Sequence, residues 1–344
     1  MPNNIVILGN GFDLSLGLPT KYVDFVNSSH WPIKDLDSAH FGEPNLYNFL
    51  YQYIQSNKDT LGNVRWIDLE NLLLQYALSK SEQPVYFKDE KEIIKYDQHI
   101  FQQIKESFIR YIVDVVSRKG SGFNLRHCVG SQVISQIANN KTFKKIYSFN
   151  YTNTSSVLDF ICNWKPEIIH IHGQAYTYNN HIILGIGSGK GINKEYKFFL
   201  KDRQKGFVAH DLNEDLFSAE QIVFYGISFG GSDFTYFKRF FEEVVRNHTS
   251  KDKKKLIHIF TYDDESKAAI ADAFEDSGLE MREIFSCIDI RFYLEKDFSL
   301  SINGRNEYEI FRKLMLDTMP KTDSLVTAEV EKFMDDRHYD KFEY

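Results

Sequence analysis

A glycine-rich turn near the start of the chain holds the first residues that could do chemistry. Its members are Gly9, Asn10, Gly11, Asp13, Gly17 and Pro19, and an apolar run at residues 5–8 precedes them. Glycine permits a tight turn and lets backbone N–H groups approach a pyrophosphate, while a following helix presents the positive end of its dipole. The turn therefore predicts a nucleotide phosphate site. The alternative is a purely structural strand-to-helix turn.

Asp13 fits this interpretation least well. A carboxylate close to phosphate oxygens is repelled unless a metal ion, a ribose hydroxyl or a backbone N–H group takes it up. Two hypotheses therefore remain for Asp13. It either contacts the bound ligand or caps the start of the following helix.

Asn150 and Thr152 lie in a second segment, SFNYTNT at residues 148–154, which follows an apolar run and precedes a helical pattern. Open α/β folds bind ligands at the carboxyl edge of their sheet, where this segment would lie. We therefore expect Asn150 to contact a ligand. Capping of the next helix by Asn150, Thr152 or Thr154 is the alternative.

His170 and His172 lie two residues apart in a third segment, and strand alternation would put both on one face. An imidazole with a pKa near 6.5 at the end of a strand suits a general base, so His172 is the candidate. His170 is expected to be a buried structural histidine. No third His, Cys or carboxylate follows at a fixed short spacing, so the sequence predicts no metal site here.

The fourth segment contains Gly226, Ser228 and Asp233 and again follows an apolar run. Gly226 permits close approach of a ligand, and the Ser228 hydroxyl could bind a ribose or a phosphate. Asp233 could contact the ligand or cap the next helix.

Seven short apolar runs are expected to be strands, and helical patterns separate most of them. They are residues 5–8, 145–149, 168–171, 182–184, 222–225, 256–261 and 288–293. Nearly continuous apolar runs are typical of strands covered on both faces. The sequence therefore predicts an α/β fold with a Rossmann-like, doubly wound, mostly parallel sheet.

The connection between the first two strands exceeds about 100 residues, far more than an ordinary crossover, and predicts a helical insertion at about 35–140. Its helices are expected at 46–55, 68–77 and 91–116, where apolar residues recur every three or four positions. One nucleotide-binding domain is expected over residues 1–320, closed by a helix at 306–316 with Asn306 as its cap. A charged tail follows at 321–344.

Composition narrows the class of protein. A net charge of −7 argues against nucleic acid as the primary ligand, although residues 190–205 are locally basic and read as a solvated helix or loop. Three distant cysteines argue against disulfides and a four-cysteine zinc module. No apolar run approaches membrane-spanning length and no export signal is recognised, so we expect a soluble, cytoplasmic protein without membrane contact.

Taken in order, the motifs resemble the bacteriophage abortive-infection AbiH family, whose proteins are associated with defence against phage. The resemblance spans residues 5–237 and rests on GNGFDLSLGLPTKYVDF, WIDLE, SFNYTNT, IHIHG followed by ILGIG, and FYGISFGGSDFTYF. A nucleotide is the expected ligand. A second copy of the chain or a partner protein of the defence system stays open as an assembly partner.

A more distant similarity to sirtuins implies the chemistry. GNGFDLSLGLP has the glycine and proline spacing of the sirtuin motif GAGxSxxxGIP. Asn150 and His172 match the sirtuin strand-end Asn and catalytic His, and Gly226 with Ser228 resembles the segment that contacts ribose and adenine. Sirtuin-like domains of bacterial defence hydrolyse NAD, so the resemblance implies NAD as the substrate. Asn150 would orient a ribose hydroxyl or water, His172 would accept the proton, and no metal is expected.

The departures from the sirtuin pattern leave other functions open. Asp13 stands where sirtuins have Ser, and Thr152 replaces the Asp that grips nicotinamide. The paired cysteines of the sirtuin zinc module are missing, which argues against protein deacylation.

Two alternative functions remain. One is a metal-dependent nuclease or phosphodiesterase with Asp13, Glu70, His172 and Asp233 as ligands. The other is a nucleotide-sensing module without catalysis.

Overall fold

The computed structural model of the chain describes residues 4–35, 45–65, 67–82, 90–116, 128–177, 180–207, 212–230, 233–248, 254–300, 309 and 311–315. Residues 311–315 are helical, as expected for the closing helix. The predicted cap Asn306 and the predicted tail at 321–344 lie outside the described residues. Of the helices described, none combines the length and apolarity needed to cross a bilayer.

Six parallel strands form one sheet in the order β3-β2-β1-β4-β5-β6. They are β1 (Asn4–Leu8), β2 (Phe143–Ser148), β3 (Glu167–His170), β4 (Gln221–Tyr225), β5 (Lys255–Thr261) and β6 (Ile288–Leu294). The order reverses between β1 and β4, which is the point where doubly wound sheets bind ligands. The predicted Rossmann-like fold is confirmed.

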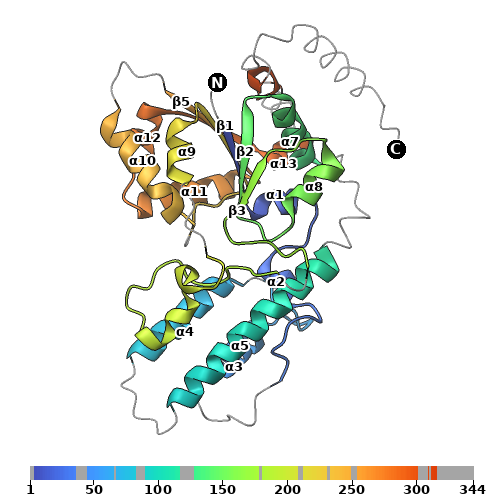
Figure 1. The fold of residues 1–344 in the computed structure, drawn as a ribbon, viewed down its shortest axis with the longest axis vertical. Coiled ribbons are helices and arrows are strands. Elements are labelled where there is room, and N and C mark those ends of the chain that lie inside the picture. Colours follow the sequence, from blue (N-terminus) through green and yellow to red (C-terminus); the bar gives the residue numbers. More distant parts are fainter. Residues whose placement is uncertain are drawn as a thin grey trace.

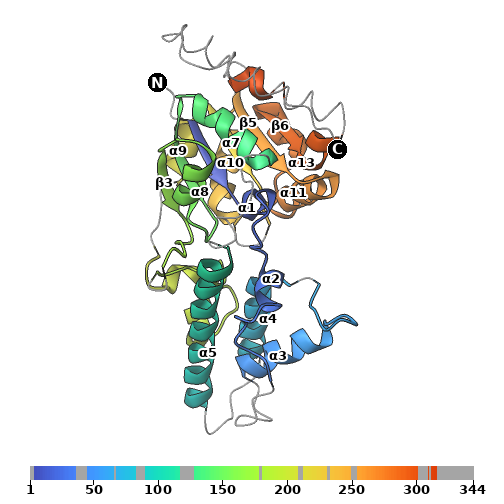
Figure 2. The ribbon, with the colours of Figure 1, turned by 90° about the vertical axis from the view of Figure 1, so that its right-hand side faces the viewer.

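Helices cover both faces of this sheet (Figures 1 and 2). Val6 and Leu8 of β1 join one apolar core, whereas Ile5 and Ile7 join the other, because successive side chains of a strand point to opposite faces. Helices α1 (Asn10–Ser15), α7 (Val129–Asn139) and α8 (Thr154–Ile161) contribute to the first core. Helices α9 (Leu212–Ser218), α10 (Thr235–Asn247), α11 (Asp264–Asp276) and α12 (Met281–Cys287) contribute to the second. Helix α13 (Glu295–Leu300) follows β6.

The strand expected at 182–184 is wrong. Only Ile182 pairs, through an isolated antiparallel bridge with Gly173. The run is apolar because it is an extended connection buried in the core, and the Ile183 N–H donates to the carbonyl of His172 at 2.8 Å. Burial by tertiary packing therefore produced a strand-like pattern in a segment that supports the end of β3.

Most of the connection between β1 and β2 forms a helical part below the sheet (Figure 2). It contains α2 (Tyr22–Val26), α3 (Leu46–Ser56), α4 (Leu69–Glu82) and α5 (Glu90–Tyr111), and α5 continues as the π-helix η2 (Ile112–Val116). The segment after β3 adds the 3₁₀ helices η3 (Lys194–Phe199) and η4 (Lys201–Arg203) to this part. Helices therefore occur where the apolar periodicity of 46–55, 68–77 and 91–116 predicts them.

A buried carboxylate ties the helical part together. Asp97 of α5 accepts hydrogen bonds from the Leu46 N–H at the start of α3 (2.7 Å), the Tyr76 hydroxyl of α4 (2.6 Å) and the Tyr196 hydroxyl of η3 (3.2 Å). Burial raises the pKa of Asp97 to about 6, although these hydrogen bonds oppose the rise. The polar centre thus fixes four elements around one position, and η3 becomes a fixed wall of the helical part.

Candidate functional site at the strand ends

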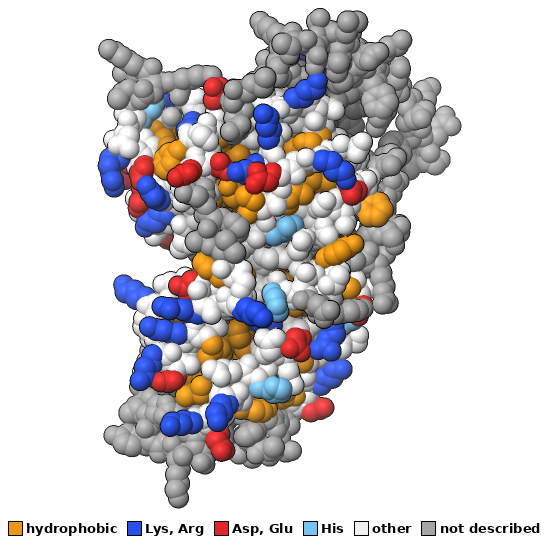
Figure 3. Space-filling model, viewed as in Figure 1, with side chains coloured by type: hydrophobic (Ala, Val, Ile, Leu, Met, Phe, Trp, Pro, Cys, Tyr) orange, Lys and Arg blue, Asp and Glu red, His pale blue; other side chains and the backbone are white. Residues whose placement is uncertain are grey.

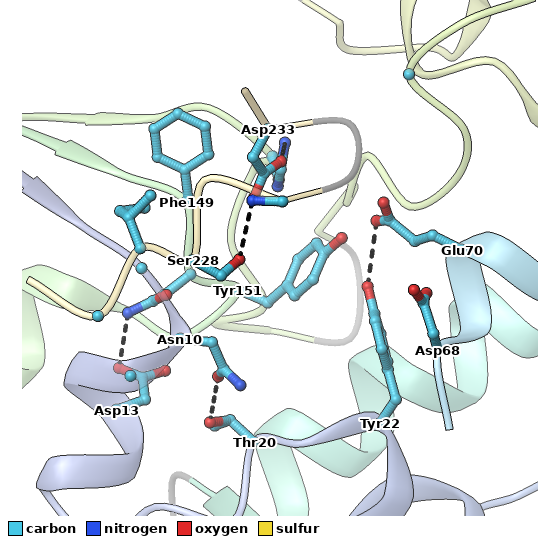
Figure 4. Close-up of a pocket in the computed structure, with 18 of the residues that line it drawn as sticks. Asn10, Asp13, Thr20, Tyr22, Asp68, Glu70, Phe149, Tyr151, Ser228 and Asp233 are labelled. Atoms are coloured by element: carbon cyan, nitrogen blue, oxygen red, sulfur yellow. Dashed lines mark hydrogen bonds and ion pairs between the residues drawn. The ribbon is translucent and has the colours of Figure 1, made fainter. Parts of the chain in front are cut away.

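A pocket of about 810 Å³ opens where β1, β2, β3 and β4 end. Residues that follow these strands line one side, and Tyr22, Asp68, Glu70 and Leu74 of the helical part line the other (Figure 4). Of the residues predicted for the site, all but Pro19 line it: Gly9, Asn10, Gly11, Asp13, Asn150, Thr152, His172, Gly226, Ser228 and Asp233. The topology therefore brings residues more than 200 positions apart to one cavity.

Pro19 lies outside this lining, so its expected ligand contact has no support in the structure. Its carbonyl oxygen instead accepts a hydrogen bond from the Tyr111 hydroxyl at 2.7 Å, which joins the turn to the end of α5. Thr20 beside it donates to the Asn10 side chain at 2.6 Å (Figure 4). Pro19 and Thr20 therefore stabilise the turn through these two hydrogen bonds, and Pro19 does not line the pocket.

The glycines form the floor of the pocket by backbone contact between β1 and β4. A Cβ on Gly11 would lie 2.5 Å from the Gly226 Cα, and one on Gly226 (φ +67°) would lie 2.4 Å from the Gly11 Cα. The Gly9 and Gly11 N–H groups donate to the carbonyls of Tyr225 and Gly226 at 2.9 and 3.0 Å. These two amides are therefore already used, and the expectation that they hold a pyrophosphate needs correction, because the glycines serve close packing.

Asp13 is a buried acceptor at the centre of the pocket wall. It lies within α1, is 1% exposed, and accepts hydrogen bonds from Asn150 Nδ2 (3.0 Å) and Thr152 Oγ1 (2.8 Å). Burial raises the pKa of Asp13 to about 7, and these two hydrogen bonds limit the rise. The expected helix cap at Asp13 is wrong, since the N-cap of α1 is Gly9.

Asn150 is held so that only one end of its amide is satisfied. Its Nδ2 donates to Asp13 Oδ1 at 3.0 Å, which leaves the amide oxygen on the other side of the group. The Asn150 side chain is 4% exposed, and within the described part of the chain no group hydrogen-bonds to its Oδ1 atom. An unsatisfied buried acceptor in a pocket lining indicates a donor on the ligand. The cap of α8 is Asn153, not Asn150, Thr152 or Thr154.

His172 lies just beyond the end of β3 and lines the pocket, whereas His170 is the last residue of the strand and does not. The His172 ring packs against Phe149 and Tyr236 and is 4% exposed. Burial, and then the charge of Lys201, lower its pKa to about 3. The expected value near 6.5 is wrong, so His172 stays neutral at physiological pH. Burial also lowers the pKa of His170.

Lys201 is a site residue that sequence reasoning missed. It is 3% exposed. The expectation that the basic segment 190–205 is solvated is therefore wrong for Lys201. Its Nζ lies 3.0 Å from Glu70 Oε2, 3.7 Å from Asp233 Oδ1 and 3.5 Å from His172 Nε2. Glu70 belongs to α4, so this cluster joins the helical part to the ends of β3 and β4. Periodic spacing gave no signal, because the exposed residues Lys197 and Arg203 surround Lys201 in sequence.

The loop after β4 is fixed by an unusual backbone conformation. Phe229 has a φ of +56°, which costs about 1–3 kcal/mol for a residue other than glycine. Its fully buried ring packs against Phe224, Phe237 and Phe274, which offsets that strain. Ser228 stays exposed on the same loop. Asp233 does not cap α10, whose N-cap is Phe234.

The charged groups lining this pocket are mainly acidic. The lining includes Asp13, Asp68, Glu70 and Asp233; Lys201 does not line the pocket itself, but its Nζ lies 3.0 Å from Glu70 and 3.7 Å from Asp233 and offsets part of their charge. Two tyrosines add hydroxyl groups, and Tyr22 donates to Glu70 Oε1 at 3.2 Å (Figure 4). Across the described residues no group of three or more His, Cys, Asp or Glu side chains is arranged to hold a metal ion. The pocket therefore favours ligand groups that donate hydrogen bonds or carry positive charge.

Comparison with known proteins identifies the family. The sequence model of the family described as "Bacteriophage abortive infection AbiH" matches residues 5–252, which is most of the chain and covers β1 to α10. No curated protein and no solved structure matches the chain. The matched range contains every residue of the pocket described above. The chain therefore belongs to the bacteriophage abortive-infection AbiH family, and its role is defence against phage by abortive infection.

Proposed function

We propose that the strand-end pocket hydrolyses an N-glycosidic bond of a nucleotide, and that NAD is the substrate, cleaved between nicotinamide and ribose. The observation that carries the proposal is the Asp13–Asn150 pair, which leaves a buried amide oxygen unsatisfied in the pocket. A ribose hydroxyl, or a water molecule beside the ribose, is a donor of the right kind. Depletion of NAD would then stop an infected cell from supporting phage growth.

The acidic lining supports this bond as the target. Cleavage of a glycosidic bond passes through a state with positive charge on the sugar, and carboxylates near that charge stabilise it. The nicotinamide ring of NAD is itself a cation before cleavage. Lys201 offsets part of the charge of Glu70 and Asp233, but the four carboxylates of the lining outnumber it, so the pocket matches the nicotinamide–ribose half of NAD. It matches the pyrophosphate poorly, and the exposed polar residues Asn10, Ser188 and Ser228 would face that group instead.

The residues present can carry a balanced reaction. The oxygen of a water molecule bonds to the anomeric carbon, the bond to nicotinamide breaks, and nicotinamide leaves with the bonding electron pair. Asp13 takes the proton, because its pKa of about 7 suits a general base at neutral pH and its oxygens keep lone pairs beyond those used by Asn150 and Thr152. Asn150 orients the water or the ribose. His172, neutral across this range, is a hydrogen-bond partner of the ribose rather than the proton acceptor.

The test is turnover of NAD by the purified chain, with nicotinamide and ADP-ribose separated by chromatography. We expect Asn150→Ala, His172→Ala and Asp13→Asn to lower turnover by at least about 100-fold, the usual size of a positioned catalytic group. Asn153→Ala is the matched control, because it removes a neighbouring amide that caps α8.

The same variants are also compared in phage-infected cells, because the activity of the purified chain could require a signal that only infection provides. NAD should fall in cells that make the wild-type chain and stay constant with Asn150→Ala. Constant NAD in both settings would contradict the proposal. Loss of RNA or DNA that depends on a divalent metal would indicate a nuclease instead. Binding of NAD without any chemical change would indicate a nucleotide sensor.

A further inference from the structure

A second groove lies on the helical part and is separate from the strand-end pocket. It has a volume of about 1040 Å³, and α5 forms one wall while residues 180–182 and 198–205 form the other. Its basic side chains come from both walls: Lys105 and Arg110 from α5, and His181, Arg203 and Lys205 from the other. On the face drawn in Figure 3, several Lys and Arg side chains lie over this helical part, with some Asp and Glu side chains among them.

Lys105 is built into the groove rather than left mobile. Its Nζ donates to Gln204 Oε1 at 2.7 Å, and the Gln204 amide nitrogen donates in turn to the carbonyls of Leu184 and Phe199. Those two carbonyls fix which end of the Gln204 amide faces Lys105. The ammonium thus has a defined position and keeps two N–H donors for another partner.

Among the described residues, no acid pairs with the Lys105 ammonium. Burial lowers the pKa of Lys105 to about 8, which is the mark of a positive charge without a counter-charge. The two acids that the described residues contribute to the groove, Glu106 and Asp114, have other partners. Glu106 faces Arg110 at 3.8 Å, and Asp114 faces His30 at 3.3 Å. The groove therefore carries an excess of positive charge around a half-buried lysine.

We propose that this groove binds an oligophosphate group, either free or as the polyphosphate of a nucleotide, at Lys105 with Arg203 and Lys205. Burial removes water from the Lys105 ammonium, and a bound anion would stabilise its charge in place of that water. Guanidinium groups such as that of Arg203 bind phosphate oxygens through paired N–H donors. The volume is that of a site for a molecule of nucleotide size. The site does not depend on the NAD chemistry of the first pocket, although η4 contributes to both, since Lys201 contacts Glu70 and His172 of that pocket while Arg203 lines this groove.

The test is calorimetric titration of the full chain with inorganic tripolyphosphate, ATP, adenosine and a short RNA. We expect tripolyphosphate and ATP to bind and adenosine not to bind. Lys105→Met should weaken tripolyphosphate at least about tenfold, as loss of a charged hydrogen bond does. The matched control, Lys95→Met, removes an exposed lysine of the same helix outside the groove and should leave the affinity unchanged.

The outcomes separate this site from its rivals. If Lys105→Met does not fold, Lys205→Met at an exposed position replaces it and should weaken binding about threefold or more. The proposal is overturned if tripolyphosphate does not bind, or if both Lys105→Met and Lys205→Met retain full affinity. It is overturned as well if Asn150→Ala alone abolishes binding, because the anion then occupies the first pocket. Binding of RNA without tripolyphosphate would mark a nucleic-acid surface instead.

Discussion

Replacing Asp13 by asparagine should stabilise the protein at neutral pH while removing its proposed activity. The folded state raises the pKa of Asp13 from 3.8 to about 7 because the carboxylate is buried. Above pH 7 Asp13 is therefore ionised in the folded chain, where burial disfavours the charged carboxylate. A difference of about three pKa units corresponds to about 4 kcal/mol, at 1.36 kcal/mol per unit. The amide oxygen of the introduced asparagine could still accept from Asn150 Nδ2 in nearly the same volume.

The sign of the pH dependence follows from proton binding. Between pH 4 and 7 the folded state holds a proton on Asp13 that the unfolded state has lost, so wild-type stability falls as pH rises. The variant lacks this group. Its advantage in free energy of unfolding should therefore grow through that range, by up to about 1.4 kcal/mol per pH unit, and level off above pH 7.

Urea unfolding of both proteins from pH 4.5 to 8.5 measures this difference. Asp264→Asn is the matched control, because it removes an exposed carboxylate from α11, and any slope that both variants share is subtracted. An advantage of Asp13→Asn that stays constant or shrinks as pH rises would show that burial does not penalise the charge of Asp13. Loss of NAD turnover in a more stable protein would then separate function from folding.

Two further predictions concern the floor of the pocket and the buried lysine. Gly226→Ala should destabilise the fold by about 3 kcal/mol or more in urea unfolding, because the added Cβ would meet backbone atoms of Gly11. The control is Gly278→Ala, which has a similar φ of +81° but open space around it and should cost only about 1–2 kcal/mol. Equal losses would contradict close packing as the role of Gly226. Lys201→Met should destabilise by about 3 kcal/mol and raise the pKa of His172, followed by NMR titration of the imidazole; an unchanged pKa would show that Lys201 does not act on His172.

The centre of the sheet could be predicted from sequence because strands β1 and β4 are buried on both faces. Residues 5–8 and 222–225 read as continuous apolar runs, and both lie in fully buried strands. The same signal failed at 182–184, since a buried connection is apolar for the same reason as a buried strand. Apolarity reports burial, and pairing depends on neighbours that the sequence does not place.

The pocket could be anticipated only in part. Strand ends located Asn150 and His172, because parallel strands direct their carboxyl ends to one edge. The contact between Asp13 and Asn150 joins residues 137 positions apart, so no local pattern contained it. The burial of Lys201 was hidden likewise, because it arises from the helical part folding against the strand ends. The role of the glycines was misjudged, since close packing and anion binding select the same residue type.

A crystal structure of the wild-type chain with a carbocyclic, uncleavable NAD analogue would show where each half of the substrate binds. We expect the ribose ring of the nicotinamide half, or a water beside it, within hydrogen-bond distance of Asn150 Oδ1. The nicotinamide should lie among the carboxylates and the pyrophosphate toward Ser228. An analogue bound with its pyrophosphate buried against Asp13, or bound outside the strand-end pocket altogether, would contradict the proposed function of this pocket.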